Sequence, residues 1–335
     1  MATTYQALVL QPDYSLAFEH RSLQDPPEGY ALVRMQAAAL NHRDVYITQG
    51  KYAAIQPGCA LGSDGCGTVA AVGSQEDKNW LDAEVIINPN INWGPSGRHQ
   101  DMKQYRILGM PTDGTLAEYL VVPVDRLSSR PAHLRPEQAA ALPLGGMTAY
   151  RALFSRGALK DGQHVLISGV GGGVAQFALQ FAVAAGARAW VTSGKPENII
   201  RALELGAEGG ASYKEPAWDQ KLREQADGFH LAIDSAGGDQ INTLLNLLNP
   251  GGRYVFYGAT NGVPTRLDLH KIFWKQLNIL GSTMASDDEF QSMLHFVQQH
   301  RIQPVVDQVF PFAEARAAFQ YLDTGHTMGK VVIRF

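Results

Sequence analysis

Apolar and polar residues alternate in short runs over the first third of the chain, a pattern typical of strands that bury one face. Clusters of glycine, proline, asparagine and aspartate separate the runs and mark turns. The pattern predicts a small β-rich unit, with strands at residues 5–10, 31–39, 67–72, 84–87 and 119–123. Residues 88–115 have no clear period, which predicts a long excursion that forms a lobe or a lid.

From about Leu144 the pattern changes, because short apolar runs now alternate with segments of helical period. Such alternation predicts a parallel sheet with crossover helices. The expected strands are residues 165–167, 187–192, 229–233, 253–257 and 277–281, with a helix at 240–248. Pro250-Gly251-Gly252 is the expected stop between that helix and the next strand. The last fifty or so residues predict helices at 287–299 and 313–323 and a strand at 330–333.

A glycine-rich turn joins the first strand of this region to its helix. Gly169, Gly172 and Ala175 fit a GxxGxxA spacing, and a second strand follows the helix. Without Cβ atoms the turn can approach a pyrophosphate, and the helix N-terminus offers unpaired N–H groups. The turn therefore predicts a dinucleotide site, whereas a tight strand-to-helix turn is the alternative. The expected contacts are Gly169, Gly172, Gly173 and Val174.

The tip of the second strand bears on the choice of cofactor. An NAD-selective site places Asp or Glu there to bind the ribose 2′-hydroxyl, but this chain reads Thr192-Ser193-Gly194-Lys195. Two hydroxyls and a lysine suit a 2′-phosphate, so the sequence favours NADP(H). Asn198 and Tyr213 are further expected neighbours of the phosphate. The alternative is an ordinary solvated turn.

Composition limits the classes of protein to consider. A chain of 335 residues with 45% hydrophobic residues can build about two ordinary domains. A net charge of −4 argues against nucleic acid and acidic membranes as partners. The first residues lack a basic stretch followed by an apolar one, so we expect a cytoplasmic protein. Cys59 and Cys66 are too few for a disulfide framework or a four-cysteine zinc site and are expected to be packing residues.

Several separated segments together resemble the medium-chain dehydrogenase/reductase family over nearly the whole chain: LNHRDVYITQGKY, LGSDGCGTVAAVG, GTLAEYLVVP, AALPLGGMTAYRAL, the glycine turn, NPGGRYVFYG and GKVVI. The resemblance implies an α/β protein with a discontinuous GroES-like β-rich catalytic domain at 1–146 and 285–335. A Rossmann domain with a doubly wound parallel sheet is implied at 147–284. It also implies a homodimer, possible assembly into a homotetramer being left open, in which residues 253–257 form a sheet-edge strand that pairs across subunits.

Departures from the family pattern concern its zinc sites. Zinc-dependent members carry Cys, the His of a Gly-His-Glu and a second Cys where this chain has Asn41, Ser63 followed by Asp64, and Gly145. No cysteine lies in residues 88–115, where those enzymes have their structural zinc lobe. We therefore expect no metal, with His42 and His99 as ordinary polar histidines. The resemblance then points to the zinc-independent, quinone oxidoreductase-like branch, which transfers hydride from NADPH to a quinone or an α,β-unsaturated carbonyl.

The same resemblance implies roles for particular side chains. Asn41, Tyr46 and Tyr52 match positions near the substrate, where they would donate hydrogen bonds to the reduced oxygen. For both tyrosines, aromatic packing is the equally weighted alternative. Asp44 is expected to form an internal salt bridge, with Arg43 as its partner.

Further cofactor contacts are implied along the chain. His42 and Lys330 match basic positions near the pyrophosphate, with solvent exposure as the alternative for each. Thr148 would pack against the nicotinamide, while Met284 would lie where the chain returns to the catalytic domain. The positions bordering the ribose and the nicotinamide end are Ser235, Ala236, Gly258 and Ala259.

Two other functions stay open at this stage. One is an NADPH-binding redox sensor or structural protein without significant turnover. The other is alcohol dehydrogenase-type activity on alcohols or aldehydes, which would require zinc held by unusual ligands. The sequence alone does not identify the substrate, and Trp93 in the excursion has no assigned role.

Overall fold

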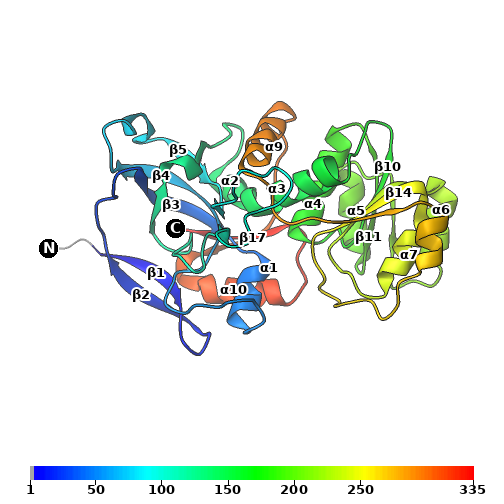
Figure 1. Cartoon of the computed structure of the whole chain (residues 1–335). Helices are drawn as coiled ribbons and strands as arrows, with labels where there is room; N and C mark the ends of the chain where they lie inside the picture. Colours follow the sequence, from blue (N-terminus) through cyan, green and yellow to red (C-terminus); the bar gives the residue numbers. More distant parts are fainter. Residues whose placement is uncertain (1–3) are drawn as a thin grey trace. The chain divides into compact units, whose positions relative to one another are not determined.

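The computed structural model describes residues 4–335 and divides the chain into two compact units. Unit 1 contains the chain up to Leu144 together with Ser286–Phe335, and unit 2 contains Gly145–Ala285. In Figure 1 the blue and cyan segments and the red C-terminal segment belong to unit 1, whereas the green and yellow strands belong to unit 2. The N-terminal and C-terminal segments thus build one unit, and the middle of the chain builds the other.

Unit 1 is organised around a seven-stranded sheet with the strand order β16-β17-β3-β4-β5-β9, in which β8 also pairs with β3. The long strand β3 is the centre, because β4 follows one of its edges and β8 and β17 share the other. The strands are β3 Tyr30–Ala39, β4 Asp64–Val72, β5 Glu84–Ile87, β8 Tyr119–Pro123, β9 Leu127–Ser129, β16 Val306–Pro311 and β17 Lys330–Arg334.

Smaller elements complete unit 1. A hairpin of β1 (Thr4–Leu10) and β2 (Leu16–Ser22) and a two-stranded sheet of β6 (Asn90–Ile91) and β7 (Arg106–Ile107) stand beside the main sheet. One apolar core joins β1 to α1, α10 and β17 through Leu8, Ile47, Phe319 and Ile333. The helices are α1 His42–Thr48, α2 Pro136–Ala141, α9 Asp287–Gln299 and α10 Ala315–Asp323, with short 3-10 turns at Lys78–Trp80, Val124–Arg126 and Phe312–Glu314. Helix α3, Pro143–Tyr150, begins in unit 1 and continues into unit 2.

Unit 2 is a six-stranded sheet whose strand order is β12-β11-β10-β13-β14-β15. All of its pairings are parallel, and the order runs outward from β10 in both directions, which is the doubly wound arrangement. The strands are β10 His164–Ile167, β11 Arg188–Ser193, β12 Gly209–Ser212, β13 Phe229–Asp234, β14 Leu248–Phe256 and β15 Asn278–Gly281.

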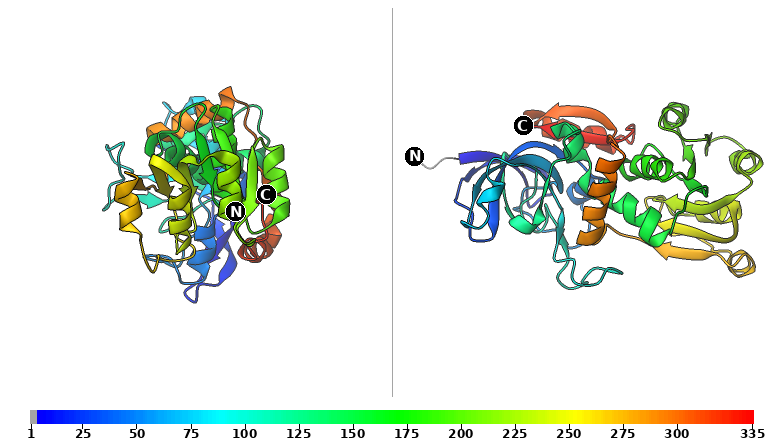
Figure 2. Two further views of the ribbon diagram at one scale, coloured as in Figure 1. Left: turned by 90° about the vertical axis from the view of Figure 1, so that its right-hand side faces the viewer. Right: turned by 90° about the horizontal axis from the view of Figure 1, so that it is seen from above.

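Helices connect these parallel strands and flank the sheet (Figures 1 and 2). Residues of α6, α7 and α8 share one apolar core over a single face of the sheet. Right-handed crossovers place α4 and α5 over the opposite face, because the strand order reverses at β10. The helices are α4 Gly173–Ala184, α5 Pro196–Glu204, α6 Trp218–Ala226, α7 Gln240–Leu247 and α8 Leu269–Trp274, and a π-helical turn spans Arg151–Arg156.

The expected fold class, a β-rich unit plus a doubly wound parallel sheet, is confirmed, but two details were wrong. Residues 253–257 do not form the edge of their sheet, because β15 pairs outside β14. Pro250-Gly251-Gly252 lies inside β14, where the pairing register jumps between Phe229 and Leu231, rather than before the strand.

In the excursion, Trp93 is buried against Tyr105, so it belongs to the lobe's own core. Within residues 4–335 no helix has the length and apolarity needed to cross a membrane.

Candidate active site

The carboxyl ends of the parallel strands in unit 2 carry the glycine turn. Gly169 follows β10 with φ of +64°, a backbone conformation that glycine adopts without strain. Gly172 is the N-cap of α4, and a glycine there leaves the helix without a capping side chain. Within the described residues, the N–H groups of Gly173 and Val174 meet no acceptor. The turn therefore presents backbone donors and the positive end of a helix dipole to an anion.

The next strand ends in the hydroxyl-rich turn that the sequence singled out. Thr192 is buried, and its Oγ1 accepts the Gly169 N–H at 3.3 Å, so this hydroxyl ties the second strand to the glycine turn. Ser193 Oγ accepts the Lys195 N–H at 3.1 Å. Tyr213 lies against the same turn, because a Cβ on Gly194 would lie 2.6 Å from its hydroxyl oxygen. Asn198 is buried in the first turn of α5.

A buried carboxylate, Asp234, shapes the loop after β13. Its oxygens accept the Ser168 hydroxyl, the Tyr254 hydroxyl at 2.5 Å, and the backbone N–H groups of Ala236 at 3.1 Å and Gly237 at 2.9 Å. Burial, followed by the charge of Asp234, raises the pKa of the Tyr254 phenol, which keeps it a hydrogen-bond donor. Sequence reasoning missed this residue, although an Asp at the end of a buried strand was a visible signal.

The loops after β13 and β14 approach each other closely. A Cβ on Gly258 would lie 2.8 Å from the Ser235 carbonyl oxygen, so only glycine fits there without a shift. The Asn261 N–H also donates to the Ala236 carbonyl at 2.8 Å. The two loops therefore meet at the carboxyl ends of the parallel strands, which is where ligands of doubly wound sheets bind. The residues that gather there are Ser235, Ala236, Gly258 and Ala259. Thr148 and Met284, the other positions expected in this unit, are both buried, and Met284 has φ of +45°.

Unit 1 contains a buried hydrogen-bonded ion pair at the start of α1. Lys330, 3% exposed, donates from Nζ to Asp64 Oδ2 at 2.8 Å and to Asn41 Oδ1 at 2.5 Å. Asn41 Nδ2 donates to the same Asp64 oxygen at 3.0 Å. The other oxygen of Asp64 accepts the Leu144 N–H at 2.7 Å, and Asp64 is fully buried. We call this group the Lys330 cluster, defined by Lys330, Asp64 and Asn41.

A second buried cation, Arg43, lies on α1, two residues after Asn41. Its NH1 donates to Ser63 Oγ at 2.6 Å and to the Leu108 carbonyl at 3.1 Å. The same atom lies 3.7 Å from Asp44 Oδ1, so the expected salt bridge between Arg43 and Asp44 is confirmed. Burial raises the pKa of Asp44, and the Arg43 charge opposes that shift. Asp44 Oδ2 accepts the Asn41 backbone N–H at 2.8 Å, which fixes the start of the helix.

The two tyrosines of this segment have different surroundings. Tyr52 packs its ring 5.2 Å from the Arg43 guanidinium, and its hydroxyl accepts from Arg43 Nε at 3.5 Å. Tyr46 is half-buried on α1, and its ring centroid lies 6.3 Å from that of His42. Desolvation and the Lys330 charge lower the pKa of His42, although the ring retains solvent access. The contacts of Tyr46 and Tyr52 with substrate and of His42 with the cofactor stay predictions.

Zinc, which some members of the resembled family bind, does not fit the residues present in unit 1. Asn41 offers an amide and Ser63 a hydroxyl, and both are already bonded to cations, Lys330 and Arg43. Burial raises the pKa of Cys66 to about 12 and also raises that of Cys59, so neither thiol offers a thiolate. Among residues 4–335, no three His, Cys, Asp or Glu side chains gather closely enough to hold a metal ion. A divalent ion would have to displace a buried ammonium.

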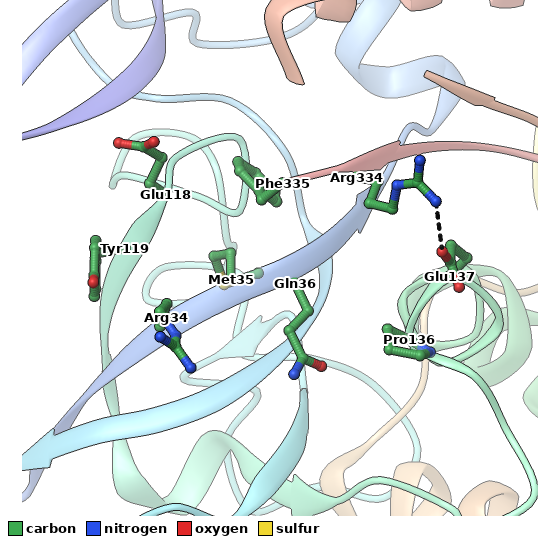
Figure 3. A pocket seen from close by; sticks show the side chains of 9 residues that line it. All are labelled: Arg34, Met35, Gln36, Glu118, Tyr119, Pro136, Glu137, Arg334 and Phe335. Carbon is green, nitrogen blue, oxygen red and sulfur yellow. Dashed lines mark ion pairs between the residues drawn. The ribbon is translucent and has the colours of Figure 1, made fainter. Parts of the chain in front are cut away.

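A separate cavity of about 500 Å³ opens on unit 1, where β8 and β17 share the edge of β3 (Figure 3). Figure 3 shows Arg334 turned toward Glu137, and these side chains form an ion pair at 3.8 Å. The lining residues are Arg34, Met35, Gln36, Glu118, Tyr119, Pro136, Glu137, Arg334 and Phe335. None of them is a predicted site residue, so this cavity is distinct from the Lys330 cluster.

Comparison with known proteins decides the family. The "Alcohol dehydrogenase GroES-like domain" model matches residues 27–132, and the "Zinc-binding dehydrogenase" model matches residues 173–299. The zinc-type alcohol dehydrogenase-like protein YogA of Leptosphaeria maculans is 33% identical, over 96% of this chain and 94% of its own. The chain belongs to the medium-chain dehydrogenase/reductase superfamily. It is therefore an oxidoreductase of that family.

Other members of the medium-chain dehydrogenase/reductase superfamily differ in what their names state. A solved structure named NAD-dependent alcohol dehydrogenase has a TM-score of 0.90 and 32% identity, over 98% of this chain and 99% of its own. The crotonyl-CoA carboxylase/reductase of Cereibacter sphaeroides is 28% identical, over 92% of this chain and 80% of its own. Dehydrogenases and a reductase therefore both occur among the relatives, so reaction and cofactor must be argued from the residues of this chain.

Proposed function

We propose that this protein is an NADPH-dependent oxidoreductase that transfers hydride, without a metal, to a quinone or an α,β-unsaturated carbonyl. The observation that carries the proposal is the Lys330 cluster. Asn41 stands where zinc-dependent members have a cysteine ligand, yet its amide is bonded to an ammonium and a carboxylate. An alcohol needs a Lewis acid before it surrenders hydride, whereas a conjugated acceptor spreads the incoming charge over its own π system.

The choice of NADPH rests on the turn after β11. Ser193, Lys195 and Tyr213 meet there, and no carboxylate occurs between Thr192 and Pro196 to bind a ribose 2′-hydroxyl. A 2′-phosphate can accept hydrogen bonds from the hydroxyls and the ammonium. The N–H groups of Gly173 and Val174, which meet no acceptor in the described part of the chain, suit the pyrophosphate. One relative is named NAD-dependent, so the preference of this chain for NADPH is not transferred from its relatives and needs its own test.

The chemistry requires little of the protein beyond placement and hydrogen bonding. NADPH supplies the hydride when bound. As the hydride adds to the β-carbon of an enone, the π electrons move onto the carbonyl oxygen, and a proton from solvent completes the reduction. Asn41 Nδ2 has a second hydrogen that meets no acceptor within residues 4–335. The single hydrogen of the Tyr52 hydroxyl, whose oxygen accepts from Arg43, also meets no acceptor there. These donors can stabilise the oxygen as charge develops on it.

The proposal is tested by mixing the purified protein with NADPH and, in turn, a quinone, an enone and an aldehyde, after its zinc content has been assayed. We expect NADPH oxidation with the quinone or the enone from protein that contains no stoichiometric zinc. Tight binding of NADPH with no oxidation by any acceptor would instead favour a sensor or structural role. Activity that depends on bound zinc and is lost with a chelator would favour an alcohol dehydrogenase.

Replacing Lys195 with alanine tests the cofactor assignment. We expect the Kd for NADPH to rise about tenfold, since a charge-assisted hydrogen bond to the 2′-phosphate is lost, while the Kd for NADH changes little. Both constants are measured by nucleotide fluorescence titration. The matched control is Lys160→Ala, an exposed lysine before β10, at the end of that strand opposite the glycine turn, which should change neither value. Equal losses for NADPH and NADH in the Lys195 variant would contradict the assignment.

We also propose that the protein is a homodimer that pairs through the β15 edge of unit 2. Large apolar side chains gather beside this edge on α8: Phe273 is 63% exposed and Trp274 is 83% exposed. The outer edge of β15 pairs with no strand among residues 4–335, and such an edge with exposed aromatic neighbours suits pairing with a second copy. Val263, Leu267 and Leu269 extend the exposed apolar surface.

The double substitution Phe273→Lys and Trp274→Lys tests this interface. We expect the wild type to elute as a dimer and the variant as a monomer in size-exclusion chromatography with light scattering, because two desolvated aromatic groups become charged. Ile200→Lys is the control, since Ile200 is 60% exposed on α5 and lies away from β15 in the sheet order. A wild type that is monomeric, or a variant that stays dimeric, would refute this interface.

A further inference from the structure

Within the Lys330 cluster, Asn41 is held by one backbone contact and two side-chain contacts. The Asn41 backbone N–H is bonded to Asp44, its Oδ1 to the Lys330 ammonium and its Nδ2 to Asp64. A lysine ammonium only donates and an ionised carboxylate only accepts. These partners therefore fix which end of the Asn41 amide is oxygen and which is nitrogen. The amide cannot turn by 180° without facing a donor to a donor and an acceptor to an acceptor.

Fixing the amide decides what Asn41 offers to a ligand. As N-cap of α1, an asparagine side chain usually accepts from the N–H of the third helical residue. Here that bond is not made, since the side chain turns to Asp64 and Lys330 instead. Within residues 4–335, the second Nδ2 hydrogen of Asn41 has no partner, so the amide group left for a ligand is a hydrogen-bond donor. A turned amide would present its oxygen, which repels the oxygen of a carbonyl.

The ammonium also polarises the amide. A cation bound at Oδ1 draws electron density toward the oxygen and makes the N–H groups stronger donors. Because Lys330 is 3% exposed and Asp64 is fully buried, little water is present to screen this effect. The charges of Lys330 and Asp64 balance, which keeps the pair compatible with burial.

We propose that Lys330 is a positioning residue for the reaction: its ammonium orients and polarises the Asn41 amide, which donates a hydrogen bond to the reduced oxygen of the acceptor. This inference rests on the proposed function, because it names the group that recognises the acceptor's oxygen. It differs from the expectation that Lys330 neutralises the cofactor pyrophosphate, since the Nζ atom already has two partners in unit 1. The two roles predict different losses.

The test replaces the ion pair by a neutral pair, Lys330→Met with Asp64→Asn. This variant leaves no unpaired buried charge, and the new amide oxygen can still accept the Leu144 N–H. We expect the single-turnover rate of NADPH oxidation by an enone such as 2-cyclohexenone to fall about tenfold. The Kd for NADPH should stay within about twofold of the wild-type value. Lys330→Arg, which keeps a donor cation, should restore most of the rate.

The coupling to Asn41 is measured by placing the same neutral pair in an Asn41→Leu background. If Lys330 acts through the Asn41 amide, the pair should cause no further loss there. The control is another neutralised ion pair of unit 1, Arg126→Met with Asp287→Asn, which removes a 2.9 Å contact outside the cluster and should leave the rate unchanged. A loss of equal size in the Asn41→Leu background would overturn the inference.

Two further outcomes separate the inference from its alternatives. A full rate in the neutral-pair variant overturns it, as does an unchanged rate with weakened NADPH binding, which would assign Lys330 to the cofactor. If the wild type itself binds NADPH but reduces no acceptor, the proposed function fails, and the inference fails with it. The wild-type measurement therefore distinguishes the two failures.

Discussion

Substituting leucine for Asn41 should lower the rate of hydride transfer to an enone about a hundredfold while leaving the Kd for NADPH nearly unchanged. Leucine has almost the shape of asparagine but no amide, so the donor to the developing oxygen charge is lost. The Lys330 ammonium keeps its contact with Asp64 at 2.8 Å, which preserves the buried ion pair. Stopped-flow absorbance of NADPH under single-turnover conditions measures the rate without interference from product release.

A general loss of stability must be separated from this loss of a donor. Asn88→Leu removes another buried asparagine of unit 1, whose Nδ2 donates to Asp287 at 2.9 Å outside the Lys330 cluster. That control should keep the wild-type rate even if its Tm falls. If Asn41→Leu retains at least half of the wild-type rate, the amide is not the group that stabilises the reduced oxygen.

Replacing Asp234 with alanine should reduce the free energy of unfolding by about 3–5 kcal/mol. The carboxylate accepts four hydrogen bonds from Ser168, Ala236, Gly237 and Tyr254, and all four donors would lose a buried partner. The loop after β13 would lose its anchor, so NADPH binding should weaken as well. Urea unfolding followed by circular dichroism gives the stability, and fluorescence titration gives the Kd.

Asp239→Ala is the matched control for that substitution. Asp239 lies at the end of the same loop, directly before α7. It accepts two hydrogen bonds, from the Thr265 N–H at 2.7 Å and from the Thr265 hydroxyl at 2.8 Å. These bonds lower the pKa of Asp239, but the residue is exposed, so water can replace them. We therefore expect the free energy of unfolding to change much less than in the Asp234 variant. Comparable losses for the two aspartates would mean that burial does not set the importance of Asp234.

Much of the fold could be predicted from the sequence because its elements have strong local signals. The helix at Asp287–Gln299 and the strands at Glu84–Ile87 and Tyr119–Pro123 have the predicted bounds, since amphipathic periods and turn residues mark their ends. The edge of the unit 2 sheet could not be read in this way. Whether a strand is covered depends on the next strand, and β15 is a run of only four residues.

The candidate site divides along the same line between local and non-local signals. The glycine turn and the Thr192–Lys195 turn are contiguous in sequence, so their residues could be named before their contacts were known. The Lys330 cluster joins side chains that are 266 and 289 residues apart along the chain. Lys330 was recognised as a basic residue near the last strand, but its partners depend on the pairing of β17 with β3.

Asp64 lies where zinc-dependent members have part of a metal-binding motif, and its partner in this chain is a cation that the sequence alone does not reveal. The sequence indicated that a metal-binding motif was lost at Ser63 and Asp64, and it gave no reason to expect a cation in its place. The structure shows that Asp64 binds the Lys330 ammonium and the Leu144 N–H, while Ser63 binds Arg43. A lost ligand set is thus accompanied by internal cations, which a motif search for metal ligands does not look for.

The measurement that tests the central claim most directly is single-turnover oxidation of NADPH by 2-cyclohexenone, using protein that has been treated with a chelator and assayed for zinc. The account predicts acceptor-dependent oxidation at the same rate before and after chelation. It also predicts that NADPH deuterated at the transferred position reacts more slowly, as hydride transfer requires. Oxidation that disappears with the metal and returns when zinc is added would contradict the account, because the Lys330 cluster would then not replace the metal.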